Sequence, residues 1–136
     1  HFGAAHQEGD AIVHVPSEGV LFAGDLLFNE STPMGRVGSY QAFSDALDRI
    51  IELAPETIVP GHGPVCGLDE VRAEQACVSE VQRRGGRVLQ QNAAVAMPGG
   101  YRMQLRVRMP KGETRNLGCT YSSQSGQVRL DVLSGA

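Results

Sequence analysis

Residues 58–65 read Ile58-Val59-Pro60-Gly61-His62-Gly63-Pro64-Val65, a short apolar strand that runs directly into a turn with a histidine at its centre. Glycines on both sides of His62 permit backbone conformations that are closed to other residues, and the two prolines stiffen the turn. Such a turn holds an imidazole at a fixed angle at the end of a strand, as a metal site requires. A surface turn that carries a histidine without a ligand is the alternative.

Two stretches nearer the N-terminus carry other candidate ligands. Residues 20–25, Val-Leu-Phe-Ala-Gly-Asp, predict a strand that ends at Gly24-Asp25. A carboxylate in so apolar a stretch is costly to bury unless it is paired, hydrogen-bonded or metal-bound. A buried cap for a neighbouring loop is the alternative for Asp25. If residues 10–15 and 20–23 form a hairpin, His6 lies at the same sheet edge as Asp25, whereas His14 is predicted to be packed or on the far face.

The rest of the chain predicts two helices and then an antiparallel sheet. Apolar residues at helical spacing over 43–54 indicate a helix with Ser39 as its N-cap, and Pro55 ends it. A second helix is predicted from about Leu68 to Arg84, and residues 29–38 are loop-like in composition. After Gly86 the apolar period becomes two, which predicts an antiparallel meander with one apolar and one arginine-rich face. The fold class expected is therefore α/β or α+β.

The net charge of the chain changes sign near the same place as the period of its apolar residues changes. Residues 1–84 hold 5 Lys+Arg and 13 Asp+Glu, a net −8, and residues 85–136 hold 7 and 2, a net +5. We therefore expect two parts, 1–84 and 87–136. The arginines of the meander could grip an acidic partner, although a solvated outer face is the simpler interpretation, and no aromatic row is present to stack nucleic acid bases. These arginines are Arg102, Arg106, Arg108 and Arg129, with Lys111 beside them.

Composition excludes several classes of protein. The 41% apolar and 20% charged residues are those of a globular chain rather than a disordered one, and no apolar run is long enough for a membrane span. No targeting segment is visible. The three cysteines, Cys66, Cys77 and Cys119, are odd in number and widely spaced, so we expect buried free thiols rather than a disulfide scaffold. Free thiols favour a reducing compartment and hence the cytoplasm.

The motifs around His6, Asp25 and His62 together resemble the C-terminal half of the metallo-β-lactamase superfamily. The resemblance rests on Ala5-His6-x-x-Gly9-Asp10, on Val20 to Asp25 and on Ile58 to Val65, in that order and with a helix between the last two, and it covers residues 1 to about 84. It implies half of an αββα sandwich and a site with two zinc ions, other divalent metals remaining open. His6 would bind the first metal, Asp25 would be the bridging and catalytic residue, and His62 would bind the second. Asp10 would brace the loop of His6.

The same resemblance implies a hydrolase in which a metal-bound hydroxide attacks a small-molecule ester, thioester, phosphodiester or lactam. The family's first ligand motif, His-x-His-x-Asp-His, is absent from this sequence. We therefore expect an incomplete metal site and no activity from this chain alone, either as a fragment of a longer enzyme or as a half-domain. Apolar surface left by the missing half could support self-association. The alternative is a non-catalytic binding module that keeps a relic half-site and contacts an acidic partner through its basic meander.

Overall fold

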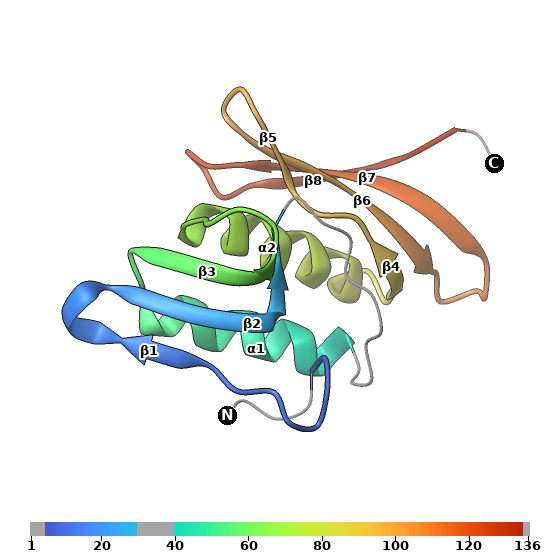
Figure 1. The fold of residues 1–136 in the computed structure, drawn as a ribbon. Helices are drawn as coiled ribbons and strands as arrows, with labels where there is room; N and C mark the ends of the chain where they lie inside the picture. Colours follow the sequence, from blue (N-terminus) through green and yellow to red (C-terminus); the bar gives the residue numbers. More distant parts are fainter. Residues whose placement is uncertain (1–4, 30–39, 135–136) are drawn as a thin grey trace.

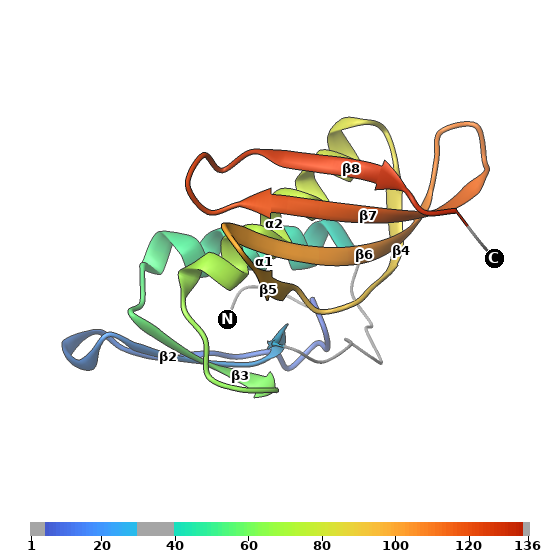
Figure 2. The same ribbon diagram turned by 90° about the horizontal axis from the view of Figure 1, so that it is seen from above.

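The computed structural model describes residues 5–29 and 40–134, so the predicted loop after Asn29 and the predicted N-cap Ser39 lie outside the described residues. Within them the chain forms two sheets with two α-helices between them (Figures 1 and 2), a mixed α+β fold as predicted. The elements are β1 Val13–Val15, a 3-10 turn at Pro16–Glu18, β2 Val20–Phe28, α1 Tyr40–Leu53, β3 Thr57–His62, α2 Leu68–Arg83, β4 Arg87–Gln91, β5 Val95–Met97, β6 Gly100–Arg108, β7 Thr114–Ser122 and β8 Val128–Val132.

The first sheet, sheet A, has the strand order β1-β2-β3. The predicted hairpin is confirmed, because β1 pairs antiparallel with β2. β2 and β3 are parallel neighbours joined through α1. The prediction that the second strand ends at Gly24-Asp25 was wrong: pairing with β3 shifts register on either side of Gly24 (φ 57°) and continues to Phe28. A glycine bulge thus bends the strand without ending it, and Asp25 lies inside β2.

Helix α1 covers one face of sheet A. Most of its predicted apolar stripe is buried and packs on the inward-facing residues of the two parallel strands, but Ile51 is only partly buried, and Ala54 lies beyond the end of the helix and is exposed. The members of this core include Leu21, Leu26, Leu27, Phe43, Ala46, Leu47, Ile50 and Ile58. The helix ends at Leu53, before Pro55, as predicted. The opposite face of sheet A leaves Val13 and Phe22, a cross-strand pair, 60% and 46% exposed.

Helix α2 belongs to two hydrophobic cores. Val71, near its N-terminus, packs with α1 and sheet A. Cys77, Val78 and Val81, further along the helix, pack under the second sheet. Figure 2 shows the helices as the middle layer between the two sheets. A buried hydrogen bond from the Gln91 amide to the Glu74 carboxylate also ties α2 to β4.

The second sheet, sheet B, is antiparallel with the order β4-β6-β7-β8, and β5 also pairs with β6. The three predicted meander strands are β6, β7 and β8. The predicted alternation is confirmed in β6, where Met103, Leu105 and Val107 are buried and the arginines between and beside them are exposed. It does not hold to the end of β8, where Val132 is 61% exposed. β4 and β5 were not predicted. Both are short, and the three residues of β5 are all exposed, so neither strand shows the apolar alternation of a half-buried strand.

The prediction of three free thiols was wrong for two of the cysteines. Cys77 in α2 and Cys119 in β7 form a disulfide across 42 residues of sequence, and Cys66 is the free, buried thiol. Spacing along the chain does not reveal which helix packs on which strand, so this pairing had no local signal. The cysteines therefore no longer support a reducing compartment. Neither described helix combines the length and apolar composition needed to cross a membrane.

Candidate metal centre

The Asp25 carboxylate lies between His6 and His62, the other two predicted metal ligands. His62 Nε2 is 3.3 Å from Asp25 Oδ1, and His6 Nδ1 is 3.8 Å from Asp25 Oδ2. The His6 side chain is 8% exposed, Asp25 38% and His62 56%. The fold therefore brings all three predicted ligands together at an edge of sheet A, with His6 on the protein side and His62 facing solvent.

The turn that carries His62 is held against the end of β2 by Asn29. The Asn29 backbone N–H donates to the His62 carbonyl (3.0 Å), and its side-chain Nδ2 donates to the Pro64 carbonyl (2.8 Å). Asn29 is itself buried, at 8% exposed. Two hydrogen bonds from one residue thus fix the turn on both sides of Gly63. The sequence reasoning missed Asn29, which follows the strand in a stretch with only a loop-like composition.

The two glycines of the turn are required for different reasons. Gly63 has φ 90°, and a Cβ there would overlap the Asn29 carbonyl. Gly61 has no positive φ, but a Cβ there would overlap the Asp25 carboxylate and lie 2.7 Å from the Gly24 carbonyl. Gly61 therefore permits the close approach of β3 to Asp25, and Gly63 provides the left-handed conformation of the turn.

The loop of His6 is held by Asp10. Its Oδ2 accepts hydrogen bonds from the backbone N–H groups of Ala5 (3.0 Å), His6 (2.7 Å) and Gln7 (3.0 Å). Burial raises the pKa of Asp10, but these three hydrogen bonds stabilise the charged form more strongly, so the pKa is below its ordinary value. The loop-bracing role that the resemblance implied for Asp10 is thus present in the structure.

The other two histidines stand apart from this group. His14 lies in β1, opposite Leu21 in the β1–β2 register, and is partly buried, as expected for a packed strand residue. His1 lies outside the described residues. His14 therefore lies apart from His6 and His62, as its position in the middle of a strand predicted.

The spacing of the three donors can be compared with the spacing of ligands around a zinc ion. Ligands about 2.0–2.2 Å from a tetrahedral zinc lie roughly 3.3–3.6 Å apart. The His62–Asp25 separation of 3.3 Å matches this, and the His6–Asp25 separation of 3.8 Å is slightly wider. Because each histidine approaches a different carboxylate oxygen, the three donors do not converge on one point. Accordingly, residues 5–29 and 40–134 contain no group of three or more His, Cys, Asp or Glu arranged to hold a single metal ion.

Comparison with known families supports the resemblance seen in the motifs. The family model of the metallo-beta-lactamase superfamily matches residues 1–62, a segment of the 136-residue chain that includes His6, Asp25 and His62. Proteins of this superfamily generally bind metal ions, usually zinc. No solved structure matches the chain. Residues 1–62 are thus similar to the metallo-beta-lactamase superfamily, and the match is consistent with a fragment of that superfamily.

Proposed function

We propose that His6, Asp25 and His62 form part of the dizinc centre of a metal-dependent hydrolase, with Asp25 bridging the two ions. The observation that carries this proposal is the placement of one histidine nitrogen near each oxygen of a single carboxylate, at 3.8 Å and 3.3 Å. If Asp25 served only as the partner of a structural ion pair, one histidine beside it would be enough. A carboxylate that has a nitrogen donor on each side is suited to bridge two ions roughly 3.5–4 Å apart.

The surrounding residues preorganise the three side chains. Asp10 fixes the backbone of His6 through three hydrogen bonds, and Asn29 fixes the His62 turn through two. Gly61 leaves the space that the Asp25 carboxylate occupies. Zinc bound here would supply Lewis acidity. It would polarise the scissile bond of an ester, thioester, phosphodiester or lactam and lower the pKa of water towards neutral pH. Rigid support of this kind is what such chemistry requires of the protein.

Three protein ligands do not suffice for two tightly held ions, because a catalytic zinc commonly has three protein ligands of its own. We therefore expect this chain alone to bind zinc weakly and to lack hydrolytic activity. After dialysis against metal-free buffer it should retain well below two equivalents of zinc, and an esterase or phosphodiesterase assay should give no rate above the blank. Two retained equivalents, or an activity that Asp25→Ala abolishes, would show that further ligands exist in this chain.

A histidine NMR experiment tests the ligand assignment without any activity. Zinc added to the chain should shift the imidazole resonances of His6 and His62 and leave those of His14 unchanged. Asp25→Asn should weaken these shifts, whereas Asp45→Asn, an exposed residue on α1, should not. Zinc shifts at His14 alone, or shifts at His6 and His62 that persist unchanged in Asp25→Asn, would contradict the proposed centre.

A further inference from the structure

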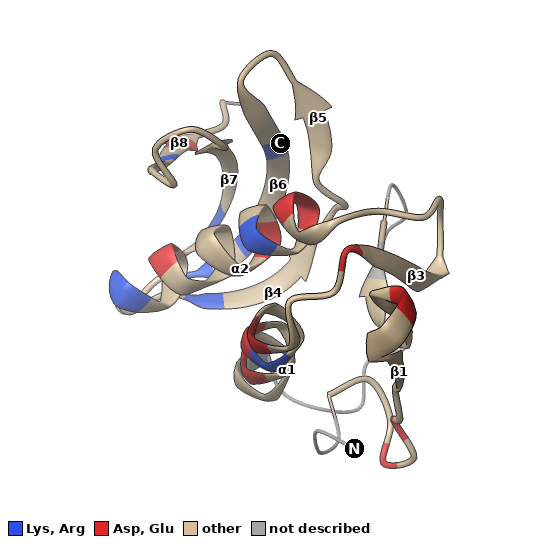
Figure 3. Ribbon diagram, turned by 90° about the vertical axis from the view of Figure 1, so that its left-hand side faces the viewer, with Lys and Arg blue, Asp and Glu red and all other residues tan. Residues whose placement is uncertain are grey.

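The outer face of sheet B carries arginines without acidic partners. Arg87, Arg102, Arg106 and Arg108, here called the arginine face, are all exposed and lie on β4 and β6. In the described part of the chain none of them forms an ion pair with a carboxylate. The two acidic residues of the C-terminal part are already paired, Asp131 with Arg129 at 3.1 Å and Glu113 with Arg115 at 2.9 Å. Figure 3 shows Lys and Arg along the strands of sheet B, whereas α1 and α2 carry residues of both charges.

Strand register concentrates this charge. Arg87 lies directly opposite Arg108, and Arg102 lies opposite Thr120, which in turn lies opposite Arg129. Like charges directly opposite each other destabilise a sheet, so the pairing of Arg87 with Arg108 is a cost to the isolated protein. An anion bound over these strands would offset that cost.

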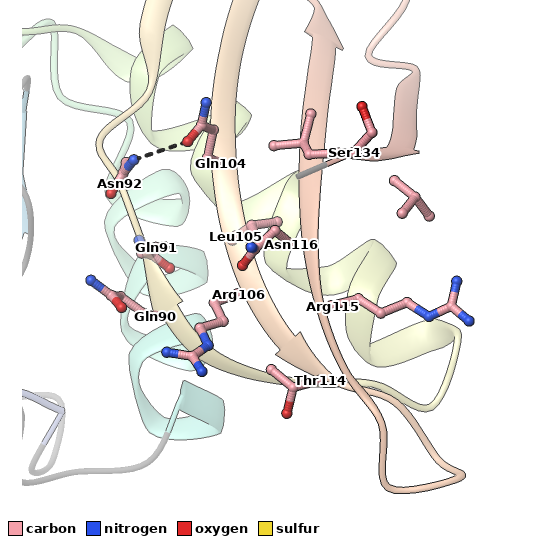
Figure 4. A pocket seen from close by; sticks show the side chains of 12 residues that line it. Gln90, Gln91, Asn92, Gln104, Leu105, Arg106, Thr114, Arg115, Asn116 and Ser134 are labelled. Carbon is pink, nitrogen blue, oxygen red and sulfur yellow. Dashed lines mark hydrogen bonds between the residues drawn. The ribbon is translucent and has the colours of Figure 1, made fainter. Parts of the chain in front are cut away.

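The arginine face borders a broad hollow of about 960 Å³. Figure 4 shows amide side chains around it, Gln90, Asn92, Gln104 and Asn116, with Arg106 among them. Gln90 and Asn116 flank Arg106 in the register of the sheet. Amides offer both donors and acceptors, and can therefore pair with the N–H and C=O groups of a peptide backbone. No aromatic side chain lines the hollow, so it offers no surface on which nucleic acid bases could stack.

We propose that the outer face of sheet B binds an acidic polypeptide segment in an extended conformation. Alternate residues of a strand lie roughly 6.6–6.8 Å apart, and an extended partner has the same repeat. Carboxylates at alternate partner positions therefore meet Arg106 and Arg108 in turn, and a carboxylate further along meets Arg102. Arginine binds carboxylates through paired hydrogen bonds, and the neighbouring amides bind the partner's backbone. This surface is independent of the metal centre, which lies on sheet A.

Fluorescence anisotropy with a labelled octaglutamate peptide at low salt tests the proposal. Arg106→Gln/Arg108→Gln should weaken peptide binding by at least about tenfold, a change of about 1.4 kcal/mol, because two charge-assisted contacts to the peptide carboxylates are lost. The control Arg49→Gln/Arg72→Gln removes the same two charges from exposed positions on the helices, and should change affinity by less than about twofold. Arg106→Gln/Arg108→Gln should unfold at the urea midpoint of the parent chain or slightly above it. The control, which loses the exposed ion pairs of Arg49 with Glu52 and of Arg72 with Asp69, should unfold at that midpoint or slightly below it.

Three outcomes would overturn the proposal. The first is the absence of peptide binding at low salt. The second is an equal loss of affinity in the two double variants, which would show a response to net charge rather than to this face. The third is tighter binding of an oligouridylate with the same number of charges, which would make the face a nucleic acid surface instead.

Discussion

Replacement of Gly61 by alanine tests whether close approach of β3 to Asp25 holds the candidate centre together. The added Cβ would overlap the Asp25 carboxylate and lie 2.7 Å from both the carbon and the oxygen of the Gly24 carbonyl group. The Asp25 side chain could turn away, but the Gly24 backbone lies in the bulged part of β2 and is paired with Pro60. Relief of the overlap therefore requires the two strands to separate or the carboxylate to leave its position between the histidines.

The expected cost is that of an overpacked site, about 1–3 kcal/mol of unfolding free energy. Gly9→Ala is the matched control, because a Cβ at Gly9 has no atom within 4 Å and Gly9 has no positive φ. That substitution should be neutral or should stabilise the fold by about 0.4–1 kcal/mol, through a less flexible unfolded chain. The structure thus predicts that the same chemical change destabilises the fold at Gly61 in β3 and does not destabilise it at Gly9 in the turn before β1.

Urea unfolding gives both free energies, and the imidazole resonances of His62 report whether Asp25 has moved. Gly61→Ala should lower the unfolding midpoint and shift the His62 resonances, and Gly9→Ala should do neither. Equal midpoints and unchanged His62 resonances in the two variants would refute the reasoning. They would mean that β2 and β3 adjust freely at this point and that Gly61 has no part in placing Asp25.

Three further predictions concern other parts of the chain. Without reductant, Cys77→Ala/Cys119→Ala should lose about 4 kcal/mol of unfolding free energy, because the disulfide restricts the unfolded chain across a separation of 42 residues. Alkylation of the unfolded, unreduced parent should label one thiol, and three labelled thiols would contradict the disulfide. Hydrogen bonds from its two neighbouring arginines lower the pKa of Glu80 from 4.5 to about 2, so these ion pairs stabilise the fold above pH 4.5 and are lost as pH falls towards 2. An NMR titration should show the pKa of Glu80 rising in Arg83→Gln, and an unchanged value would count against the pairing. Burial and two nearby glutamates raise the pKa of Cys66 to about 12, so this thiol should resist alkylation at pH 8 until the chain unfolds.

Much of the arrangement around Asp25 was predictable because its determinants are local. Glycine and proline around His62 and an acidic residue after an apolar run are visible in short stretches, and the β1–β2 hairpin follows from two apolar runs separated by a turn. The hairpin places His6 at the same sheet edge as Asp25, whereas the grouping of His62 with them was expected from the family resemblance and depends on the pairing of β2 with β3. Metal binding by them stays a prediction.

What escaped prediction depends on contacts between distant residues. Asn29 holds the His62 turn across 35 residues of sequence, and nothing near Asn29 indicates that partner. The continuation of β2 beyond Gly24 depends on pairing with β3, which a bulge hides from a strict two-residue period. The disulfide likewise requires α2 to pack on β7, a long-range contact without a motif. Patterns of one element do not carry information about its neighbour's position.

The placement of α2 in two cores has a practical consequence for anyone who divides the chain. Ending it at Arg84, where charge and periodicity change, would remove the sheet that covers Cys77, Val78 and Val81. The shortened protein would present an uncovered apolar stripe and an unpaired thiol along one helix, a surface that promotes aggregation. A shortened version intended for study of the Asp25 site would therefore need polar replacements at these three positions to stay monomeric.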